Sequence, residues 1–362
     1  MQKNNSHKNL EKGVLRDDDD GAFLRVALEL LSDLPARAQE IAQKRFGFFN
    51  GKEETLERIG KDYGITRERV RQIIADTNKK VLKKKNNLNF KKIESRIVFT
   101  IDEKFGIIGK SELIKKMAKD DKKEANALVF FCVYSDKIFR ANSEKIEEAI
   151  VTMRDVVEKV VVASDVAKEI LAKERNPLGD QEIIEKIGKK LKQKFSEKEI
   201  LSYLSVSKEI KKNNFGKWGI STWAEINPKG TKEKIYTILK EKKKPLHFLE
   251  IAKIMDEVGL SKKKAHPQTI HNELIKNEKF ILIGRGIYAL REWGYADGTV
   301  RDVLKEIFKK NGKPLDRNEI LQAVMKIRKV KKATVMINLG NSKYFSKEGG
   351  LYFLKKLKNT SK

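Results

Sequence analysis

The chain has 362 residues, with 79 Lys and Arg against 51 Asp and Glu, and a formal net charge of +28. This excess of positive charge favours a polyanionic partner, with nucleic acid as the first candidate and an anionic membrane surface as the second. A single cysteine, Cys132, excludes disulfides within the chain, and the apolar runs are far shorter than the ~20 residues that span a bilayer. The polar N-terminus carries no secretory signal, so we expect a soluble, cytoplasmic protein with no membrane partner.

Residues 1–21 are polar and predict a disordered N-terminus, with an acidic run that suits the start of the next helix. Residues 22–46 have the pattern of two helices, with Pro35 near the start of the second and Gly47 at its end. Three clustered phenylalanines are expected in the core of the module that follows: Phe46, Phe48 and Phe49.

Residues 55–82 have the pattern of a helix-turn-helix. Gly64 permits a sharp turn after a short first helix, and Thr66 is a good N-cap for a second one. The second helix carries apolar or small side chains at the spacing of a buried stripe: Val70, Ile73, Ile74, Thr77 and Val81. Polar and charged side chains lie opposite the stripe: Arg67, Glu68, Arg69, Arg71, Gln72, Lys79 and Lys80. Such a helix, with guanidinium groups and hydrogen-bonding side chains near its N-terminus, suits the major groove of DNA.

The segments RFG, TLERIG and TRERVRQI occur in this order within residues 34–82, which resemble region 4 of the bacterial sigma-70 family of transcription initiation factors. The resemblance implies that the second helix reads the −35 promoter element and that the module can dock on the RNA polymerase β subunit. The implied DNA-binding residues are Thr66, Arg67, Glu68, Arg69, Arg71, Gln72 and Lys79. The base readers among them are Arg67, Glu68, Arg71 and Gln72, which can pair with guanine, cytosine or adenine. The short segment before the match resembles no other sigma region, so we expect that the chain does not initiate transcription alone.

An internal repeat follows a Lys- and Asn-rich stretch at residues 83–92, which we interpret as a linker. Pro-Leu pairs begin at Pro177, Pro245 and Pro314, at intervals of 68 and 69 residues, and Ile107 begins a more degenerate copy. Each unit has the order helix, short helix, helix and β-hairpin, which is that of a winged helix. The predicted boundaries are 22–85 for the helix-turn-helix domain and then four winged helices: 86–160 (degenerate), 161–229, 230–295 and 296–358.

Residues 231–295 also resemble the HARE-type winged helix-turn-helix, a family that includes the N-terminal domain of the RNA polymerase delta subunit. The resemblance rests on the Pro-Leu position and on the turn at Gly286-Ile287-Tyr288. It implies association with DNA or with polymerase, and it implies no enzymatic activity. In the hairpins we expect aromatic residues to anchor the wings to the helices, while Lys217 and Arg285 are candidates for phosphate contacts, as are Lys343 and Lys347.

The sequence offers no constellation for catalysis and no cofactor or metal site. Gly109-Lys110-Ser111 does not form a phosphate-binding loop, because Lys104 stands where that loop requires its first glycine. The four histidines and the single cysteine have no zinc-site spacing. We therefore expect neither an enzyme nor a small-molecule substrate.

These patterns predict a mainly α protein with small β-hairpins, in which an N-terminal helix-turn-helix domain precedes tandem winged-helix domains. The expected function is that of a transcription factor that binds double-stranded DNA in a sequence-specific manner. We expect a nucleoid-associated, sigma-like accessory protein that binds promoter-like DNA and contacts the RNA polymerase core. Two alternatives stay open: a polymerase-binding scaffold with non-specific DNA affinity, and the DNA-targeting subunit of a restriction or modification system.

Overall fold

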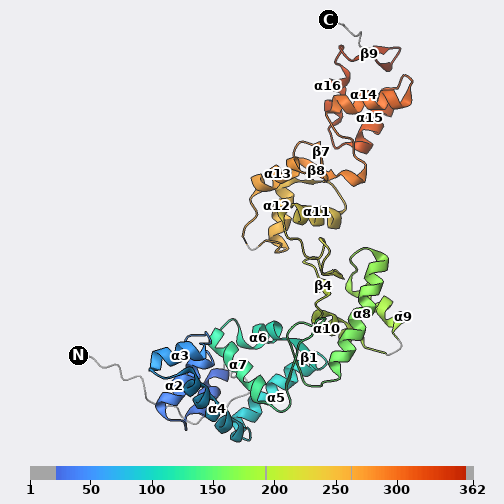
Figure 1. Ribbon diagram of the computed structural model, residues 1–362. Coiled ribbons are helices and arrows are strands. Elements are labelled where there is room, and N and C mark those ends of the chain that lie inside the picture. Colours follow the sequence, from blue (N-terminus) through green and yellow to red (C-terminus); the bar gives the residue numbers. More distant parts are fainter. Residues whose placement is uncertain (1–21, 192–193, 262, 356–362) are drawn as a thin grey trace, which may run out of the picture. The chain divides into compact units, whose positions relative to one another are not determined.

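A computed structural model describes residues 22–191, 194–261 and 263–355, so the predicted disorder of residues 1–21 lies outside the described part (Figure 1). The chain divides into two compact units, Met1–Lys211 and Lys212–Lys362, which are described separately below. The described residues form 16 α-helices and small antiparallel sheets of two or three strands. The predicted fold class is therefore confirmed. Within the described part, no helix combines the length and the apolar character needed to cross a bilayer.

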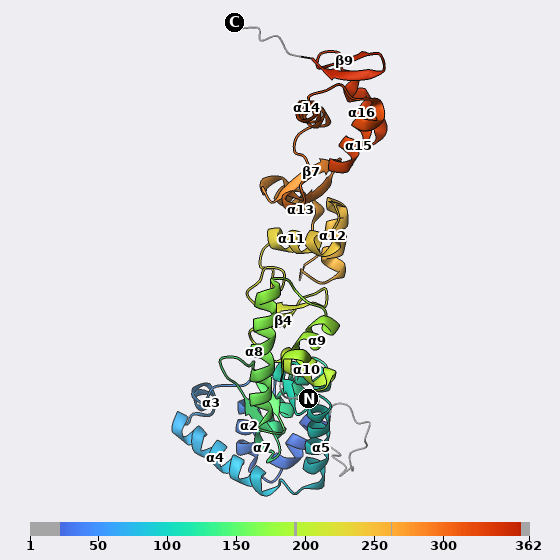
Figure 2. The same cartoon turned by 90° about the vertical axis from the view of Figure 1, so that its right-hand side faces the viewer.

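The first unit begins with the helix-turn-helix module, whose helices are α1 (Phe23–Leu31), α2 (Ala36–Arg45), α3 (Leu56–Tyr63) and α4 (Arg67–Lys83). A small core joins the last three of these helices through the fully buried side chains of Ile41, Ile59 and Val70. Figure 2 shows α4 along an outer edge of this unit. The residues on one face of α4 are exposed, from Glu68 near its start to Lys79.

The first winged helix follows without the predicted linker, because α5 begins at Leu88. Its side chains Phe90, Ile93 and Ile97 are apolar at helical spacing and fully buried, a pattern that the surrounding Lys and Asn residues obscured. Its elements are α5 (Leu88–Asp102), β1 (Ile107–Gly109), α6 (Lys110–Ala118), α7 (Lys122–Tyr134), β2 (Phe139–Ala141) and β3 (Ala149–Val151). The strands form an antiparallel sheet in the order β1-β3-β2.

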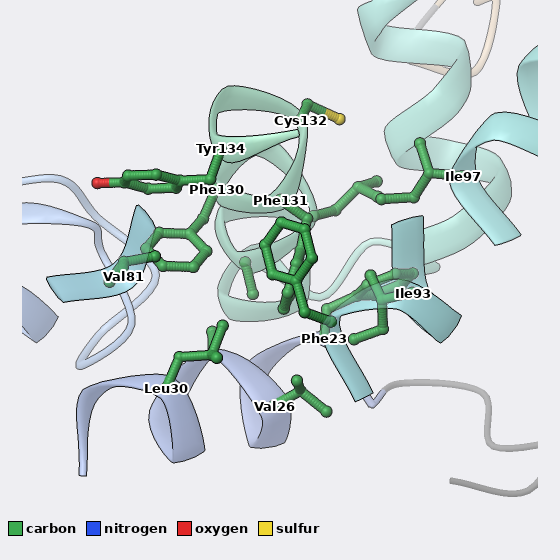
Figure 3. Close-up of a cluster of buried hydrophobic side chains, with 14 of the residues drawn as sticks. Phe23, Val26, Leu30, Val81, Ile93, Ile97, Phe130, Phe131, Cys132 and Tyr134 are labelled. Carbon is green, nitrogen blue, oxygen red and sulfur yellow. The ribbon is translucent and has the colours of Figure 1, made fainter. Parts of the chain in front are cut away.

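The helix-turn-helix and the first winged helix share one hydrophobic core (Figure 3). Phe131 of α7 is fully buried, with ring centroids of Phe23 and Phe90 at 6.5 and 5.3 Å. Phe130 packs edge-on against Phe46 and Phe48 at 5.2 and 5.5 Å. The predicted domain boundary between residues 85 and 86 thus falls between two segments that contribute to the same core.

The expectation for the phenylalanine cluster is wrong in one place, because the Phe49 side chain is 63% exposed. Phe46 and Phe48 are covered by α7 rather than by the small core of the helix-turn-helix. Of the three phenylalanines, Phe48 is buried, Phe46 is half-buried and Phe49 is exposed, and the sequence run could not indicate which module supplies the cover.

The second winged helix comprises α8 (Val156–Glu174), α9 (Asp180–Lys190), α10 (Glu197–Ser205), β4 (Ile210–Lys212) and β5 (Trp218–Ile220). Its strands β4 and β5 form a two-stranded sheet, and the division between the two units falls inside β4. Trp218 of β5 is 4% exposed.

The second unit contains the remaining two winged helices. The elements of the first are α11 (Thr231–Lys242), β6 (Leu246–His247), α12 (Phe248–Glu257), α13 (Pro267–Lys276), β7 (Phe280–Gly284) and β8 (Ile287–Leu290). Those of the second are α14 (Val300–Asn311), α15 (Arg317–Ile327), α16 (Lys332–Leu339), β9 (Phe345–Glu348) and β10 (Leu351–Leu354). The short 3-10 turn Arg291–Trp293 lies between them.

The Pro-Leu repeat has a structural cause in this unit. Leu246 pairs with Tyr288 in the sheet β6-β8-β7. Leu315 exchanges backbone hydrogen bonds of 2.9 and 3.2 Å with Tyr352. In each case the leucine side chain is buried under the hairpin, and the proline precedes it where the chain leaves a helix. The repeat therefore marks the point at which the chain pairs, over one or two residues, with the edge of the following hairpin.

Candidate nucleic-acid interface

The turn between α3 and α4 is fixed by backbone geometry and by capping. Gly64 ends α3 in the left-handed region with φ +62°, which favours glycine. The hydroxyl of Thr66 then accepts a hydrogen bond from the backbone N–H of Arg69 at 3.1 Å and starts α4. Gly60 is also required, since a Cβ there would lie 2.7 Å from the carbonyl oxygen of Ile65. This second glycine constraint was not predicted from the sequence.

The α3 helix is braced by α2 through polar contacts that the sequence did not indicate. Lys44 donates to Asp62 at 2.6 Å, and Tyr63 donates its hydroxyl proton to Glu40 at 2.9 Å. Arg37 donates to the carbonyl oxygen of Tyr63 at 2.6 Å. The hydrogen bond from Lys44 lowers the pKa of Asp62. These contacts join residues far apart in the chain, which local patterns cannot reveal.

The α4 helix separates a buried stripe from an exposed polar face. Val70, Thr77 and Val81 are at most 1% exposed, and Ile73 and Ile74 are half-buried. All seven residues proposed to bind DNA on this module are exposed: Thr66, Arg67, Glu68, Arg69, Arg71, Gln72 and Lys79. The face that the resemblance assigns to DNA is therefore open within the first unit.

Two side-chain pairs order part of this face. Arg71 makes a two-pronged contact with Glu68, with N–O distances of 2.7 and 2.8 Å. Arg69 donates to the amide oxygen of Gln72 at 3.1 Å. The hydrogen bonds from Arg71 lower the pKa of Glu68, so this carboxylate stays ionised at neutral pH. A paired arginine still has donors left, because the guanidinium carries five N–H groups.

Two of the four predicted wing cations, Lys217 and Arg285, differ in their surroundings. Lys217 contacts Glu241 at 2.9 Å and is 33% exposed, so its charge is already balanced. Arg285 is exposed at the turn between β7 and β8, beside Gly286, whose φ is +67°. A Cβ at Gly286 would lie 2.5 Å from Nε2 of His247, so this turn requires glycine for space as well as for conformation.

Lys343 and Lys347, the other two wing candidates, lie over tyrosine rings of the last winged helix. Their Nζ atoms are 5.8 and 5.5 Å from the ring centroids of Tyr344 and Tyr352. Both lysines are exposed, so a cation–π contact does not remove them from solvent.

Comparisons with known proteins agree with this geometry at two places in the chain. Residues 30–83 match the family described as Sigma-70, region 4. Over 54 residues the chain is 41% identical to the RNA polymerase sigma factor SigA of Clostridium acetobutylicum, and over 53 residues it is 42% identical to that of a Bacillus species. Each alignment covers 15% of this chain and 14% of the relative, so the chain spans only a small part of the length of these sigma factors.

Residues 230–293 match the HARE-HTH family, whose description names ASXL and restriction endonuclease HTH domains. This segment comprises α11 to β8, the winged helix that carries Arg285 and Gly286. Both predicted resemblances are thereby confirmed. The chain contains a sigma-70 region 4 helix-turn-helix and a HARE-type winged helix-turn-helix, both of them DNA-binding domains.

Proposed function

We propose that the chain binds double-stranded DNA in a sequence-specific manner, with α4 in the major groove. The observation that carries the proposal is the exposed row of hydrogen-bonding side chains at the N-terminal end of α4, opposite its buried stripe. In helix-turn-helix proteins the N-terminal residues of the second helix contact base edges. The rigid turn at Gly64 and the capped start of α4 support this geometry, since both hold the row in place.

The proposed base readers have complementary chemistry. Arg67 has a guanidinium that can fork onto the O6 and N7 atoms of guanine. Gln72 has its amide oxygen held by Arg69, and rotation of the side chain would allow it to pair with adenine. Glu68 and Arg71 bind each other, so a base that engages one of them also repositions the other. We therefore expect coupled rather than additive effects of substitutions at Glu68 and Arg71.

The biological role that we propose is that of a sigma-like accessory factor acting at promoter-like DNA, in contact with the RNA polymerase core. The proposal extends the match of residues 30–83 to region 4 of sigma factors. Chromatin immunoprecipitation of the intact chain should give enrichment upstream of genes. Binding spread evenly along the genome would contradict this role and would favour non-specific DNA affinity.

The sharpest test of the DNA-reading step is selection of bound duplexes from a random pool. The unsubstituted chain should yield a short consensus, and Arg67→Ala and Gln72→Ala should each relax it at particular base pairs, at a cost of about 1–3 kcal/mol per contact. Arg58→Ala is the matched control, because Arg58 is an exposed arginine of α3 with 72% side-chain exposure. It should leave the consensus unchanged, because Arg58 is not among the residues proposed to read bases.

The same selection can refute the proposal. If the unsubstituted chain selects no consensus, or if the Arg67→Ala and Gln72→Ala variants select the same consensus with the same stringency, α4 does not read bases. A steep dependence of affinity on salt without any sequence preference would then indicate purely electrostatic binding.

A further inference from the structure

A cavity of about 790 Å³ lies within the second unit, between the β7–β8 wing and the segment that leads into α16. Its apolar lining comes from both winged helices: Leu282, Ile287, Val300 and Val330. Its polar lining includes a threonine, Thr334, in the first turn of α16. The helix-turn-helix has no part in this cavity, and of its lining only Arg285 was predicted to contact phosphate.

Backbone contacts build the cavity. The N–H of Lys329 donates to the carbonyl oxygen of Ile283 at 3.2 Å, so the segment before α16 lies against β7. A Cβ at Gly284 would come within 2.7 Å of the carbonyl oxygen of Lys329, and only glycine permits this approach without a shift. The wing of one module and the entry to α16 of the next are therefore held together by main-chain atoms, which do not depend on side-chain rotamers.

The charge of the lining has one sign. None of the lining residues is acidic. Four of them are basic: Arg285, Arg328, Lys329 and Lys331. Arg285, Lys329 and Lys331 are exposed. This contrasts with Lys217 of the preceding hairpin, which contacts a glutamate. In a chain with 51 acidic residues, such a lining concentrates positive potential at one place.

Arg328 adds a buried positive charge to this lining. Its side chain is 7% exposed and donates to the carbonyl oxygen of Ala296 at 3.0 Å, while its Nε has no hydrogen-bond partner among the described residues. Burial lowers the pKa of Arg328, although the carboxylates of Asp297 and Asp302 act in the opposite direction. Those two carboxylates do not line the cavity and are themselves bonded to Arg291 and to Thr299. A buried, under-bonded guanidinium therefore backs the exposed cations.

We propose that this cavity binds the sugar-phosphate backbone of duplex DNA, with Arg285, Lys329 and Lys331 at the phosphates and the apolar lining under a deoxyribose. A bare anion would gain nothing from the apolar part, whereas a nucleotide backbone presents both chemistries. The first turn of α16 adds the exposed Thr334 hydroxyl and the positive end of the helix dipole, and Lys331 at the N-cap supplies no side-chain acceptor there, although its carbonyl oxygen accepts from the N–H of Thr334 at 3.0 Å. The inference rests on the proposed function in that the chain binds DNA, but it does not depend on α4.

The test measures the affinity of the full chain for a duplex that lacks the selected consensus, as a function of salt. The triple variant Arg285→Gln, Lys329→Gln, Lys331→Gln should reduce the slope of log K against log [salt] by about 2–3, because each lost phosphate contact removes about 0.9. The matched control Lys253→Gln, Lys309→Gln, Lys310→Gln removes the same charge from exposed helical positions of the same unit. It should change the slope by less than about 1. Equal slopes for the two triple variants would overturn the inference.

A second measurement needs no substitution. Acetylation of lysines in the unsubstituted chain, followed by mass spectrometry, should show Lys329 and Lys331 protected by the same duplex, with Lys253 still reactive. Protection by polyglutamate but not by the duplex would overturn the inference in favour of an acidic protein partner. The Arg67→Ala, Gln72→Ala double variant should keep this protection. Loss of the consensus would thus report on α4, and loss of lysine protection would report on the cavity.

Discussion

Replacing Phe131 with alanine removes the aromatic side chain at the centre of the core that the helix-turn-helix shares with the first winged helix. Phe131 is fully buried and contacts the rings of Phe23, Phe90 and Phe130, with centroid distances between 5.3 and 6.5 Å. Its loss deletes buried apolar surface, leaves a cavity and removes these ring contacts, which together cost about 3–5 kcal/mol. Because α1, α5 and α7 all line this site, we expect relaxation to fill little of the cavity.

The assay is native-state hydrogen exchange of the full chain, followed peptide by peptide. If the shared core makes one cooperative unit, the substitution should lower the free energy of opening by the same amount in peptides of α4 and of α7, about 3–5 kcal/mol relative to the unsubstituted chain. Phe345→Ala is the control, because Phe345 is 2% exposed in the core of the last winged helix. It should lower protection in α14 and α16 and leave α4 unchanged. Unaltered protection of α4 in the Phe131→Ala variant would refute the coupling.

Three further predictions concern the two turn regions. Thr66→Ala should cost about 1 kcal/mol and increase exchange in the first turn of α4, whereas Thr66→Ser should restore protection. Gly286→Ala should lower the thermal stability of its winged helix by more than Gly294→Ala. Both glycines have positive φ, which costs an alanine about 1–2 kcal/mol. Only the Cβ added at Gly286 would also meet an imidazole nitrogen, Nε2 of His247, at 2.5 Å. The hydrogen bond from Arg71 lowers the pKa of Glu68, so its ionised form persists as pH falls and is lost only below its ordinary range. The difference in consensus binding between Glu68→Gln and the unsubstituted chain should therefore be constant from about pH 8 to about pH 5, and a midpoint within that range would contradict the assignment.

The local features of the helix-turn-helix could be predicted because each depends on a few consecutive residues. Gly64 at the turn, Thr66 at the cap and the stripe through Val70 all follow from helix periodicity and capping chemistry. The winged-helix repeats could be predicted because four copies with one spacing repeat the same signal. The Pro-Leu pairs marked the period of the repeat, but the backbone pairing of Leu246 and Leu315 with the hairpins was not predicted, because it joins each leucine to a residue about 40 positions further on.

Features that depend on distant parts of the chain could not be predicted. Phe49 resembles its neighbours in sequence but is exposed, since the cover over Phe46 and Phe48 comes from α7, about 80 residues further on. The Lys217–Glu241 contact and the approach of Gly284 to the Lys329 carbonyl likewise join separate elements. In each case the residue type was compatible with several environments, and only tertiary packing selected one.

The four winged helices are not equivalent as DNA-binding elements, although their order of elements is the same. The third helix is the element that a winged helix offers to a groove. In the first copy this helix is α7, which packs against α1 and α5 in the shared core, with Phe131 in contact with Phe23 and Phe90. In the second copy the third helix is α10, whose first turn carries Glu197 and Glu199. Their negative charges would repel a phosphate backbone.

The third helices of the second unit have a different character. The α13 helix exposes Gln268 and Asn272, which hydrogen-bond each other at 3.0 Å and can exchange that contact for a base edge or a phosphate. The α16 helix begins at the basic cavity, with Lys331 as its N-cap. Because most of α7 is buried in the core that the first winged helix shares with the helix-turn-helix, its third helix is not free to enter a groove, and its packing supports α4 instead. We therefore expect duplex contacts by winged helices in the second unit, where the third helices α13 and α16 each have an exposed face.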